Sequence, residues 1–278
     1  MTEPLISNLP TLASEIGRAA HLFLGVDFDG TLAPIVSNPA DARVPDETRV
    51  VLEELAARRN FTIAVVSGRG LADLCSRVGS CFILAGNHGL EIMDEGFHWC
   101  HPDALKCQPL LRAICEKLRV EIGGITGALI EDKGLTASVH YRNVAPDEIP
   151  RLTETVKSAV APHVDRFLTR RGKKVTEILP RVPWHKGSAI HWMLDRLGNT
   201  VSGETAVCYI GDDATDECAF RYLPAAITVR VGTSNPTSAR FQVRDTGQVY
   251  EFLNWLRISF PQGDSRDSRA PVSSPPQP

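Results

Sequence analysis

Short runs of hydrophobic residues end in polar or glycine-rich turns at four places along the 278-residue chain. The runs are too short for typical helices and are rich in Val and Ile, which is typical of strands buried on both faces of a parallel sheet. The segments between them repeat apolar residues every three or four positions, which predicts amphipathic helices. Strands that alternate with helices indicate βαβ units and a doubly wound parallel sheet of the α/β class. The four predicted strands are Leu22 to Phe28, Phe61 to Val66, Phe82 to Ala85 and Ala206 to Ile210.

Two of the helical segments have recognisable ends. The first places apolar residues between positions 51 and 56 on one face, and Asp46 is a candidate N-cap. The second has its apolar positions between 190 and 197, and Gly198 is well placed to end it. In doubly wound sheets, ligands bind at the carboxyl ends of the strands, and the polar turns that follow the predicted strands all fall there. We therefore expect a site at this edge of the sheet.

The middle of the chain, from about 102 to 183, follows a different pattern. It predicts a helix, two strands, a second helix and two more strands. Ala137, Val139 and Tyr141 alternate with polar residues, so one face of this sheet should be buried and the other wet. We expect an antiparallel α+β unit, inserted into the parallel domain as a cap that covers the site. Its predicted strands are Ile125 to Asp132, Leu135 to Arg142, Val164 to Thr169 and Lys174 to Leu179, the last two flanking a turn at Gly172.

This pattern divides the chain into three parts. Residues 1–104 and 184–260 are expected to form a core domain, and residues 105–183 a cap domain. The last segment, 261–278, is dense in Pro, Ser and charged residues and has almost no apolar side chains. Because such a segment cannot offset the entropy lost on ordering, we predict a disordered tail.

Composition and charge restrict the partners of the protein. Hydrophobic residues make up 43% of the chain and charged residues 23%, which is ordinary for a soluble protein, and the net charge of -3 argues against a broad nucleic-acid-binding surface. The first residues do not resemble a signal peptide, and no apolar run is long enough to span a bilayer. Seven cysteines without a C-x-x-C pair favour free thiols. We expect a cytoplasmic monomer that acts on a small molecule and binds neither nucleic acid nor membranes.

The strongest chemical signal is the segment Asp27-Phe28-Asp29-Gly30-Thr31 at the end of the first predicted strand. Two carboxylates at a buried strand end are costly unless they are paired or bind a cation. One of them could attack phosphorus to form an aspartyl-phosphate, and the other could protonate the leaving alkoxide and then activate water. Gly30 would let the backbone turn and present amide groups to phosphoryl oxygens. The alternative is a polar turn between a strand and a loop.

A second acidic segment, Gly211 to Glu217, follows another predicted strand. Its four acidic residues offer the hard oxygen ligands that suit Mg²⁺. The structural alternative is an acidic helix N-terminus, which the helix macrodipole favours. That alternative explains Asp216 and Glu217 but not Asp212 and Asp213, which stand at the strand end.

Ser67 and Lys186 complete a set that suits phosphoryl transfer. Ser67 ends a strand before Gly68 and Arg69 and could donate to a phosphoryl oxygen, although a serine there could also be an N-cap. Lys186 precedes a helix and could neutralise the phosphoryl charge, although taken alone it could be a solvated lysine. With the two acidic segments, these residues provide a nucleophile, an acid/base, a donor, a cation and a metal site.

The segment His98-Trp99-Cys100-His101 hints at a metal site of another kind. Because no complementary ligand pair is visible in the sequence, we interpret it as a loop or a strand edge.

The four chemical segments resemble a known superfamily. DFDGT, VVSGR, the lysine of WHKGS and YIGDDATDE are similar, in this order, to the four motifs of the haloacid-dehalogenase (HAD) superfamily. From about residue 22 to 256 the chain also resembles the trehalose-6-phosphate phosphatase family, in DFDGTLAPI, GNHGLE, EDK, HYR, KKVTEILP, HKG and GDDATDE. The resemblance implies a HAD-like core with a C2-type α+β cap and the activity of a phosphoric monoester hydrolase.

The resemblance also implies a role for each residue at the predicted sheet edge. Asp27 would be the nucleophile and Asp29 the acid/base, while Ser67 and Lys186 would hold the phosphoryl group. The implied cofactor is Mg²⁺, held by the Asp27 carboxylate, the Asp29 backbone carbonyl and Asp212, with Asp213 and Asp216 in support.

The cap motifs of the family imply a sugar site. A disaccharide offers many hydroxyls, so its recognition calls for fixed donors and acceptors. For any one of the cap residues in this site, the structural alternative is a position on the solvated face of the cap sheet. The candidate substrate-binding residues are Glu131, Lys133, His140, Arg142, Lys174 and Glu177 in the cap and Asn87, His88 and Glu91 in the core.

The activity that this resemblance implies is hydrolysis of trehalose 6-phosphate to trehalose and phosphate, in trehalose biosynthesis. One alternative is another HAD sugar-phosphate phosphatase, which would act on sucrose 6-phosphate or mannosyl-3-phosphoglycerate. The other is a non-catalytic partner of a trehalose synthase complex. The intact set of Asp27, Asp29, Lys186 and Asp212 argues against a non-catalytic role.

Overall fold

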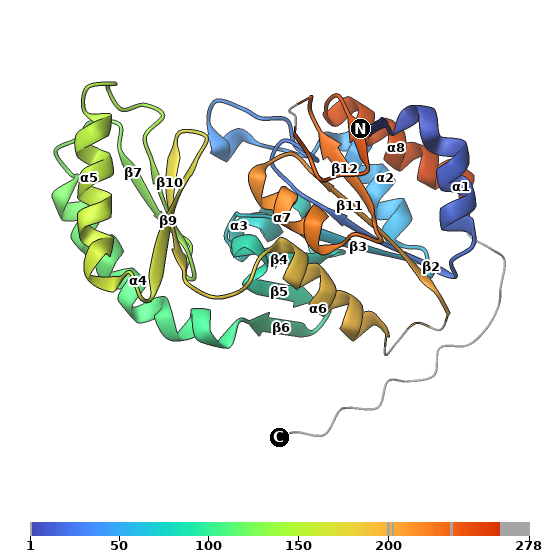
Figure 1. The fold of residues 1–278 in the computed structure, drawn as a ribbon, viewed down its shortest axis with the longest axis horizontal. Coiled ribbons are helices and arrows are strands. Elements are labelled where there is room, and N and C mark those ends of the chain that lie inside the picture. Colours follow the sequence, from blue (N-terminus) through green and yellow to red (C-terminus); the bar gives the residue numbers. More distant parts are fainter. Residues whose placement is uncertain (1, 199–200, 202, 234–235, 262–278) are drawn as a thin grey trace, which may run out of the picture.

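The computed structural model describes residues 2–198, 201, 203–233 and 236–261. A nine-stranded sheet forms the centre of the larger part of the molecule (Figure 1). Its strands pair in parallel as far as β4, and the last two strands add an antiparallel hairpin at one edge. In spatial order the strands are β1 (Glu3–Pro4), β13 (Phe241–Val243), β12 (Ile227–Val231), β11 (Thr205–Gly211), β2 (His21–Val26), β3 (Phe61–Val66), β4 (Ile83–Gly86), β5 (Glu91–Asp94) and β6 (Phe97–Cys100).

Helices cover both faces of this sheet. On one face, α1, α2, α3 and α8 share a core with the strands, in which Leu12, Leu52 and Phe252 are buried. On the other face, α6 and α7 pack through Ile190 and Phe220. This arrangement confirms the predicted doubly wound α/β fold. The helices are α1 (Leu9–Gly17), α2 (Asp46–Ala56), α3 (Leu71–Val78), α6 (Lys186–Gly198), α7 (Ala214–Tyr222) and α8 (Thr246–Ser259).

A four-stranded antiparallel sheet, in the order β7-β8-β10-β9, forms the second part of the molecule (Figure 1, green to yellow). Helices α4 and α5 pack on one face of it, around Leu111, Val139 and Leu152. The order of helix, two strands, helix and two strands agrees with the predicted insertion. The elements are α4 (Pro102–Glu121), β7 (Leu129–Asp132), β8 (Ala137–His140), α5 (Ile149–Val160), β9 (Phe167–Gly172) and β10 (Val175–Pro180).

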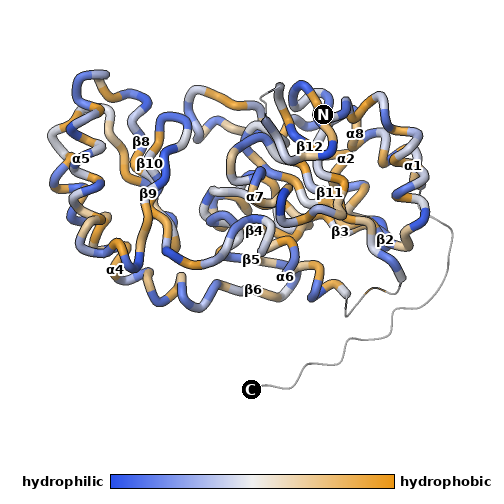
Figure 2. Tube along the Cα trace, in the orientation of Figure 1, coloured by the Kyte–Doolittle hydropathy of each residue, from blue (hydrophilic) through white to orange (hydrophobic). Residues whose placement is uncertain are grey.

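Hydropathy follows these layers. In Figure 2 the tube alternates between hydrophilic and hydrophobic along α1 and α5, as expected for helices with one buried face. Every residue of β2 is buried, as expected for a strand covered on both faces. No helix of the described residues is long and apolar enough to cross a lipid bilayer. The predicted disordered tail lies outside the described residues, apart from residue 261.

All four strands of the cap begin later than predicted, β10 by a single residue. β7 begins at Leu129, because Ile125 is buried in the turn that follows α4. β9 begins at Phe167, because Val164 is exposed just after a short 3-10 turn, η4 (Ala161–His163). β8 runs only from 137 to 140. The prediction placed these strand starts too early because apolar residues in turns resemble strand residues. The exact division into core and cap stays a prediction.

Two predictions about turns and caps were wrong. Gly172 is the last residue of β9 and pairs with β10, so the turn consists of Lys173 and Lys174. Lys174 has a φ of 64°, a left-handed conformation that residues other than glycine rarely adopt. Asp46 is the first residue of α2, and Pro45 takes the N-cap position without a side-chain hydrogen bond.

The face of the cap sheet that points away from α4 and α5 is less exposed than predicted. Ser138 on β8 is 1% exposed, and its partner in the register, Glu177 on β10, has a side chain that is 14% exposed. A core residue, His88, lies against Glu177. The cap therefore rests on the core, and contact with the core, rather than water, covers this part of the sheet.

Candidate active site

Asp27 and Asp29 directly follow β2, the central strand of the large sheet. Asp27 is 4% exposed, and its amide donates to the Ile210 carbonyl on β11 (2.9 Å), which extends the strand pairing. Gly30 then turns the chain with a φ of 86°. Because a Cβ atom at this position would collide with the Asp212 carboxylate, only glycine lets the two acidic segments approach. The structure thus places the two acidic signals of the sequence side by side.

Lys186, the first residue of α6, is the buried cation of the site. Its Nζ donates to Asp27 Oδ1 (2.7 Å) and to Asp216 Oδ1 (2.8 Å), and its side chain is 2% exposed. Burial favours the neutral amine, but the Asp216 and Asp27 carboxylates outweigh it and raise the pKa of Lys186 well above its ordinary value. The alternative of a solvated lysine is therefore wrong. A fixed positive charge stands beside the predicted nucleophile.

Asp216 organises the acidic segment from a fully buried position. Its Oδ1 accepts hydrogen bonds from Lys186 and from the Tyr209 hydroxyl (2.6 Å), and its Oδ2 accepts from the amides of Asp212 and Asp213 (2.9 Å each). Burial raises the pKa of Asp216 to about 6, against the opposing charge of Lys186. Since four donors occupy its two oxygens, Asp216 supports the acidic segment from the first turn of α7.

Asp213 is the N-cap of α7. Its Oδ1 accepts from the amides of Thr215 (2.7 Å) and Asp216 (3.2 Å), and the Asp216 side chain accepts from the Asp213 amide, which completes a capping box. Burial would raise the pKa of Asp213, but Lys186 and the bonds from Thr215 and Asp216 hold it below its ordinary range. The helix N-terminus therefore accounts for Asp213, contrary to the sequence interpretation.

The carboxylate oxygens of Asp27, Asp212 and Asp216 lie within 4.8 Å of one another. Burial raises the pKa of Asp27 well above its ordinary value against the effect of Lys186, and the neighbouring aspartates raise it further. The site thus holds more negative charge than one buried lysine neutralises. Within the described residues, Asp27 Oδ2 and Asp212 Oδ1 accept no hydrogen bond. Both oxygens could ligate a hard cation.

Lys173, at the tip of the β9–β10 hairpin, reaches this cluster from the cap. Its Nζ lies 3.1 Å from Asp212 Oδ2. The sequence analysis did not predict this contact. It selected the neighbouring Lys174 as a sugar-binding candidate, and Lys174 is exposed in the turn.

Ser67 directly follows β3 and lies at the same edge of the sheet as Asp27, because β2 and β3 are parallel neighbours. It is 1% exposed, and its carbonyl accepts from the His88 amide (2.8 Å). Its hydroxyl oxygen accepts from the Arg69 amide (3.2 Å), which is a turn-stabilising role close to the predicted structural alternative. The same hydroxyl can still donate its hydrogen.

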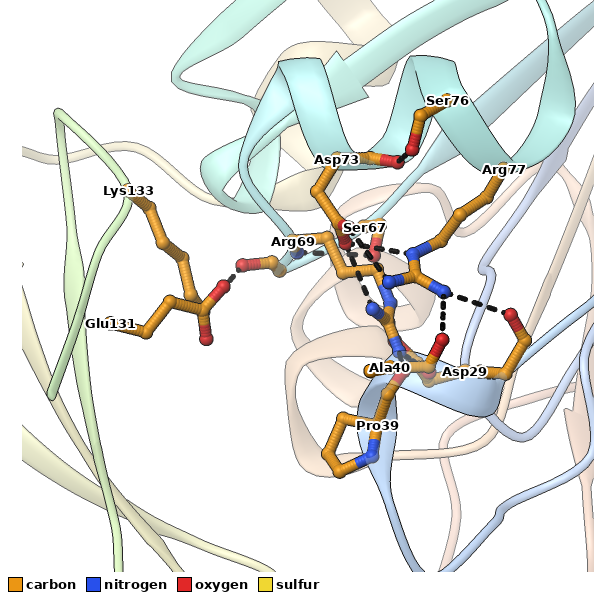
Figure 3. Close-up of polar contacts among 12 residues, drawn as sticks. Asp29, Pro39, Ala40, Ser67, Arg69, Asp73, Ser76, Arg77, Glu131 and Lys133 are labelled. Carbon is orange, nitrogen blue, oxygen red and sulfur yellow. Dashed lines mark hydrogen bonds and ion pairs between the residues drawn. The ribbon is translucent and has the colours of Figure 1, made fainter. Parts of the chain in front are cut away.

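Arg69 joins the site, although the sequence analysis did not select it (Figure 3). Its Nε donates to Asp29 Oδ2 and its Nη2 donates to Asp29 Oδ1, both at 2.7 Å. On its other side, Nη1 donates to Asp73 Oδ2 (2.8 Å). The available signal was its position two residues after Ser67, at a strand end where α/β sheets hold ligands.

His88, in the 3-10 turn η3 (Asn87–Gly89), meets Glu177 of β10 where the cap rests on the core. His88 Nε2 lies 3.0 Å from Glu177 Oε1, and Arg170 donates twice to Glu177 Oε2 (2.8 and 3.0 Å). Burial would raise the pKa of Glu177, but His88, Arg170 and Lys133 hold it well below its usual range. Burial lowers the pKa of His88 in spite of this carboxylate. Arg170 is a further residue that the sequence analysis missed.

Asn87 fastens the cap to the core. Its Nδ2 donates to Glu91 Oε2 (3.0 Å) and to the Lys133 carbonyl (3.1 Å), and its Oδ1 accepts from the Thr136 hydroxyl. Lys133, which directly follows β7, donates from Nζ to the Gly68 carbonyl (3.0 Å). Two of the predicted sugar-binding residues, Asn87 and Lys133, therefore hold the two parts of the molecule together.

The other predicted cap residues divide into a bonded pair and two exposed side chains. His140 Nε2 and Glu131 Oε2 lie 2.9 Å apart on β8 and β7. Arg142 and Lys174 are exposed in turns and not on strands as predicted. No side-chain hydrogen bond within the described residues links either of them to the rest of the predicted site.

A second group of possible metal ligands lies on the β5–β6 hairpin. Atoms of Glu91, His98 and Cys100 lie within 4.8 Å of one another. Burial and the nearby Glu91 raise the pKa of Cys100, which disfavours the thiolate that a metal requires. The segment forms β6 at the edge of the sheet, so the interpretation as a strand edge is confirmed.

The chain matches the trehalose-phosphatase family over residues 25–246. It is 35% identical over 263 residues to the trehalose-phosphate phosphatase of Mycobacterium tuberculosis strain H37Rv, which covers 90% of this chain and 66% of that protein. It is 35% identical over 258 residues to the trehalose-phosphate phosphatase of Mycolicibacterium paratuberculosis, which covers 89% of this chain and 64% of that protein. The chain thus spans slightly less than two thirds of the length of these relatives.

Solved structures share the fold. A crystal structure of a trehalose-6-phosphate phosphatase related protein has a TM-score of 0.74 at 25% identity, and the match covers 85% of this chain and 97% of that one. The C-terminal domain of the Candida albicans trehalose-6-phosphate phosphatase has a TM-score of 0.74 at 24% identity, covers 92% and 98%, and is similar in fold. The chain belongs to the trehalose-phosphatase family.

Proposed function

We propose that this chain hydrolyses trehalose 6-phosphate to trehalose and inorganic phosphate through an aspartyl-phosphate intermediate. The observation that carries the proposal is the buried pair of Asp27 and Lys186 (2.7 Å) at the carboxyl end of the central strand. A buried ion pair is weak evidence for a stabilising role, whereas buried and perturbed groups at a ligand-binding edge suit chemistry. The names of the mycobacterial relatives support the choice of substrate.

The proposed reaction has two steps. In the first, an Asp27 oxygen bonds to phosphorus, the bond from phosphorus to the sugar oxygen breaks, and Asp29 gives its proton to that oxygen. In the second, a water oxygen bonds to phosphorus, the bond to Asp27 breaks, and Asp29 accepts a proton from the water. Trehalose and phosphate leave, and both aspartates return to their starting states.

Lys186 and Ser67 are proposed to hold the phosphoryl group. The Lys186 ammonium already touches Asp27, so it stands where negative charge develops during the attack. The Ser67 hydroxyl lies at the neighbouring strand end and has a hydrogen to donate. These groups are fixed before the substrate binds, so they need little reorganisation in the transition state.

The acidic cluster fits Mg²⁺. Its donors are hard carboxylate oxygens, and those of Asp27, Asp212 and Asp216 lie within 4.8 Å of one another. We assign Asp27, Asp212 and the Asp29 backbone carbonyl as ligands, with Asp213 and Asp216 in support. When bound, Mg²⁺ would neutralise charge on these carboxylates and on the phosphoryl oxygens.

The cap is proposed to recognise the sugar. Glu177 and Glu131 are oriented by hydrogen bonds to histidine and arginine side chains, so their oxygens are ordered in advance. Preformed polar groups lower the cost of binding a molecule rich in hydroxyls. The proposed sugar-binding set is Asn87, His88, Glu91, Glu131, Lys133, His140, Arg142, Lys174 and Glu177, to which the observed contacts add Arg170 and Lys173.

The cytoplasmic location and the monomeric state expected from the sequence belong to the same proposal. Within the described residues all seven cysteines are free of disulfides, which suits a reducing compartment. The expected partner is the small-molecule substrate alone. Light scattering on the purified protein would test the monomer.

A phosphate-release screen tests the function. The panel contains trehalose 6-phosphate, sucrose 6-phosphate, mannosyl-3-phosphoglycerate and glucose 6-phosphate, each with Mg²⁺. We expect the highest kcat/KM for trehalose 6-phosphate. A higher value for another sugar phosphate, or no release from any of them, would reject the proposed substrate.

A further inference from the structure

Arg69 donates a hydrogen bond to each carboxylate oxygen of Asp29, the proposed acid/base. Nε and Nη2 each donate at 2.7 Å, and the Arg69 side chain is 11% exposed. We infer that Arg69 is a positioning residue that orients Asp29 as the base of the second step. This inference rests on the proposed function and deepens it.

Other contacts fix the guanidinium of Arg69 itself. Nη1 donates to Asp73 Oδ2 (2.8 Å), Nη2 donates to the carbonyl of Pro39 (2.9 Å), and the group lies over the Phe28 ring, 5.1 Å from its centroid. Pro39 begins the 3-10 turn η2 (Pro39–Asp41), and Asp73 lies in the first turn of α3. The contacts with α3, η2 and the Phe28 ring together hold the Arg69 guanidinium in one orientation.

A second arginine supports this arrangement. Arg77 donates to both oxygens of Asp73 (2.7 and 2.9 Å) and to the carbonyls of Ala40 (3.2 Å) and Ala42 (2.9 Å). Burial would raise the pKa of Asp73, but Arg77 and Arg69 outweigh it and lower the pKa. Figure 3 shows the resulting series of alternating charges, which runs from Asp29 through Arg69 and Asp73 to Arg77. The orientation of Asp29 is therefore tied to α3, through Asp73 in its first turn and Arg77 in its last turn.

The two bonds fix the direction of the Asp29 carboxyl group. Both arginine nitrogens donate, so both Asp29 oxygens accept. Asp29 thus stands in the structure as an oriented hydrogen-bond acceptor. An oriented acceptor is what the second step needs, when water attacks the aspartyl-phosphate. In the first step, at least one of the two bonds must loosen.

Arg69 should affect the second step of the reaction more than the first. In the second step the water oxygen bonds to phosphorus, the bond between phosphorus and Asp27 breaks, and the water proton passes to Asp29. Without Arg69 the Asp29 side chain can rotate, and proton transfer depends on its direction. Removing Arg69 should therefore slow hydrolysis of the intermediate more than its formation.

p-Nitrophenyl phosphate isolates this effect, because nitrophenolate leaves without needing a proton. For Arg69→Met we expect kcat to fall about 10- to 100-fold and kcat/KM to change less than about 3-fold, in line with the loss of one oriented acid/base. Acid quenching at steady state should reveal a larger fraction of phosphoenzyme than in the unmodified protein. Arg69→Lys, which lacks the planar fork, should restore part of kcat. Asp73→Asn should show a smaller fall in kcat, again with little change in kcat/KM.

Arg58→Met is a matched control. Arg58 also donates to backbone carbonyls, those of Arg257 and Phe260, but it precedes β3 and so lies at the opposite end of the sheet. Its variant should keep both kinetic constants.

Equal losses of kcat and kcat/KM in Arg69→Met without a rise in phosphoenzyme would overturn the inference, and so would unchanged kinetics. If Arg69→Met does not fold, unchanged phosphoenzyme in both Arg69→Lys and Asp73→Asn would overturn it. Absence of any phosphoenzyme in the unmodified protein would instead reject the proposed function.

Discussion

Lys186 donates a 2.7 Å hydrogen bond to Asp27 across 159 positions of the chain, and both side chains are almost completely buried. The first turn of α6 and the end of β2 thus bring a cation and a carboxylate together where water is excluded. In such a place, removing one partner leaves an uncompensated charge and typically costs about 3–5 kcal/mol of stability. Breaking the pair should therefore destabilise the fold. The pair is also the centre of the proposed chemistry.

Gly30→Ala should abolish activity and destabilise the protein. A Cβ atom there would collide with Asp212, and alanine at a φ of 86° adds about 1–2 kcal/mol of backbone strain. Gly96→Ala is the matched control, because Gly96 has a φ of 68° but nothing within 4 Å of the added atom. It should lose stability through strain alone and keep its activity. Urea unfolding and phosphate release measure both effects, and equal behaviour of the two variants would contradict the close approach of the acidic segments.

EDTA should stop the reaction and Mg²⁺ should restore it, because the proposed mechanism places Mg²⁺ in the acidic cluster. Mg²⁺ should also raise the Tm, since a ligand that binds only the folded state stabilises it. Asp212→Asn should remove this shift in Tm. Asp46→Asn, at a side chain that is 99% exposed, should keep it. Activity that is indifferent to both EDTA and Mg²⁺ would remove the metal from the mechanism.

Glu177→Gln and Arg142→Ala should reduce kcat/KM for trehalose 6-phosphate more than for p-nitrophenyl phosphate, which has no sugar for the cap to recognise. We expect losses of about 10- to 100-fold for the sugar substrate, as for other removed polar contacts. Glu177 should give the larger loss, because it is held in place by His88 and Arg170, whereas Arg142 is exposed. Arg151→Ala on the outer face of α5 is the control. Equal losses on both substrates would mean that the cap does not read the sugar.

Stability should fall on the acid side of neutrality partly because of Glu177. Burial opposes ionisation, but His88, Arg170 and Lys133 hold the pKa of Glu177 below its ordinary value of 4.5. The unfolded chain therefore binds this proton first, so the stabilisation is present above pH 4.5 and is lost as the pH falls toward the folded-state pKa. Glu177→Gln should cost about 1–3 kcal/mol near neutral pH and flatten the acid-side decline of the unfolding free energy. Parallel curves for the two proteins would contradict this assignment.

Local signals made much of the fold and of the catalytic motifs predictable. The run of Val and Ile in β3 has the same bounds in the structure as in the prediction, Phe61–Val66. Asp27, Ser67 and Asp212 each follow a parallel strand, so chain direction alone put them at one edge. The family match then confirmed the family that the motifs resembled.

Contacts between distant segments could not be predicted in the same way. Arg69 meets Asp29 across 40 positions, and Lys173 meets Asp212 across 39. No periodicity in the sequence states which arginine meets which aspartate, because sheet order and the docking of the cap decide it. The turn of this hairpin lies at Lys173 and Lys174 and not at Gly172, and nothing in the sequence indicated that Lys173 would meet the acidic cluster.

The most direct test is to locate the phosphoryl group during turnover. Acid-quenched protein is digested, and mass spectrometry identifies the peptide that carries it. The account predicts the phosphoryl group on Asp27, its absence in Asp27→Asn, and a loss of at least about 10³-fold in kcat for that variant, as for other removed nucleophiles. Asp46→Asn, at an exposed side chain, should behave as the unmodified protein. A phosphoryl group on another residue, or full turnover by Asp27→Asn, would contradict the account.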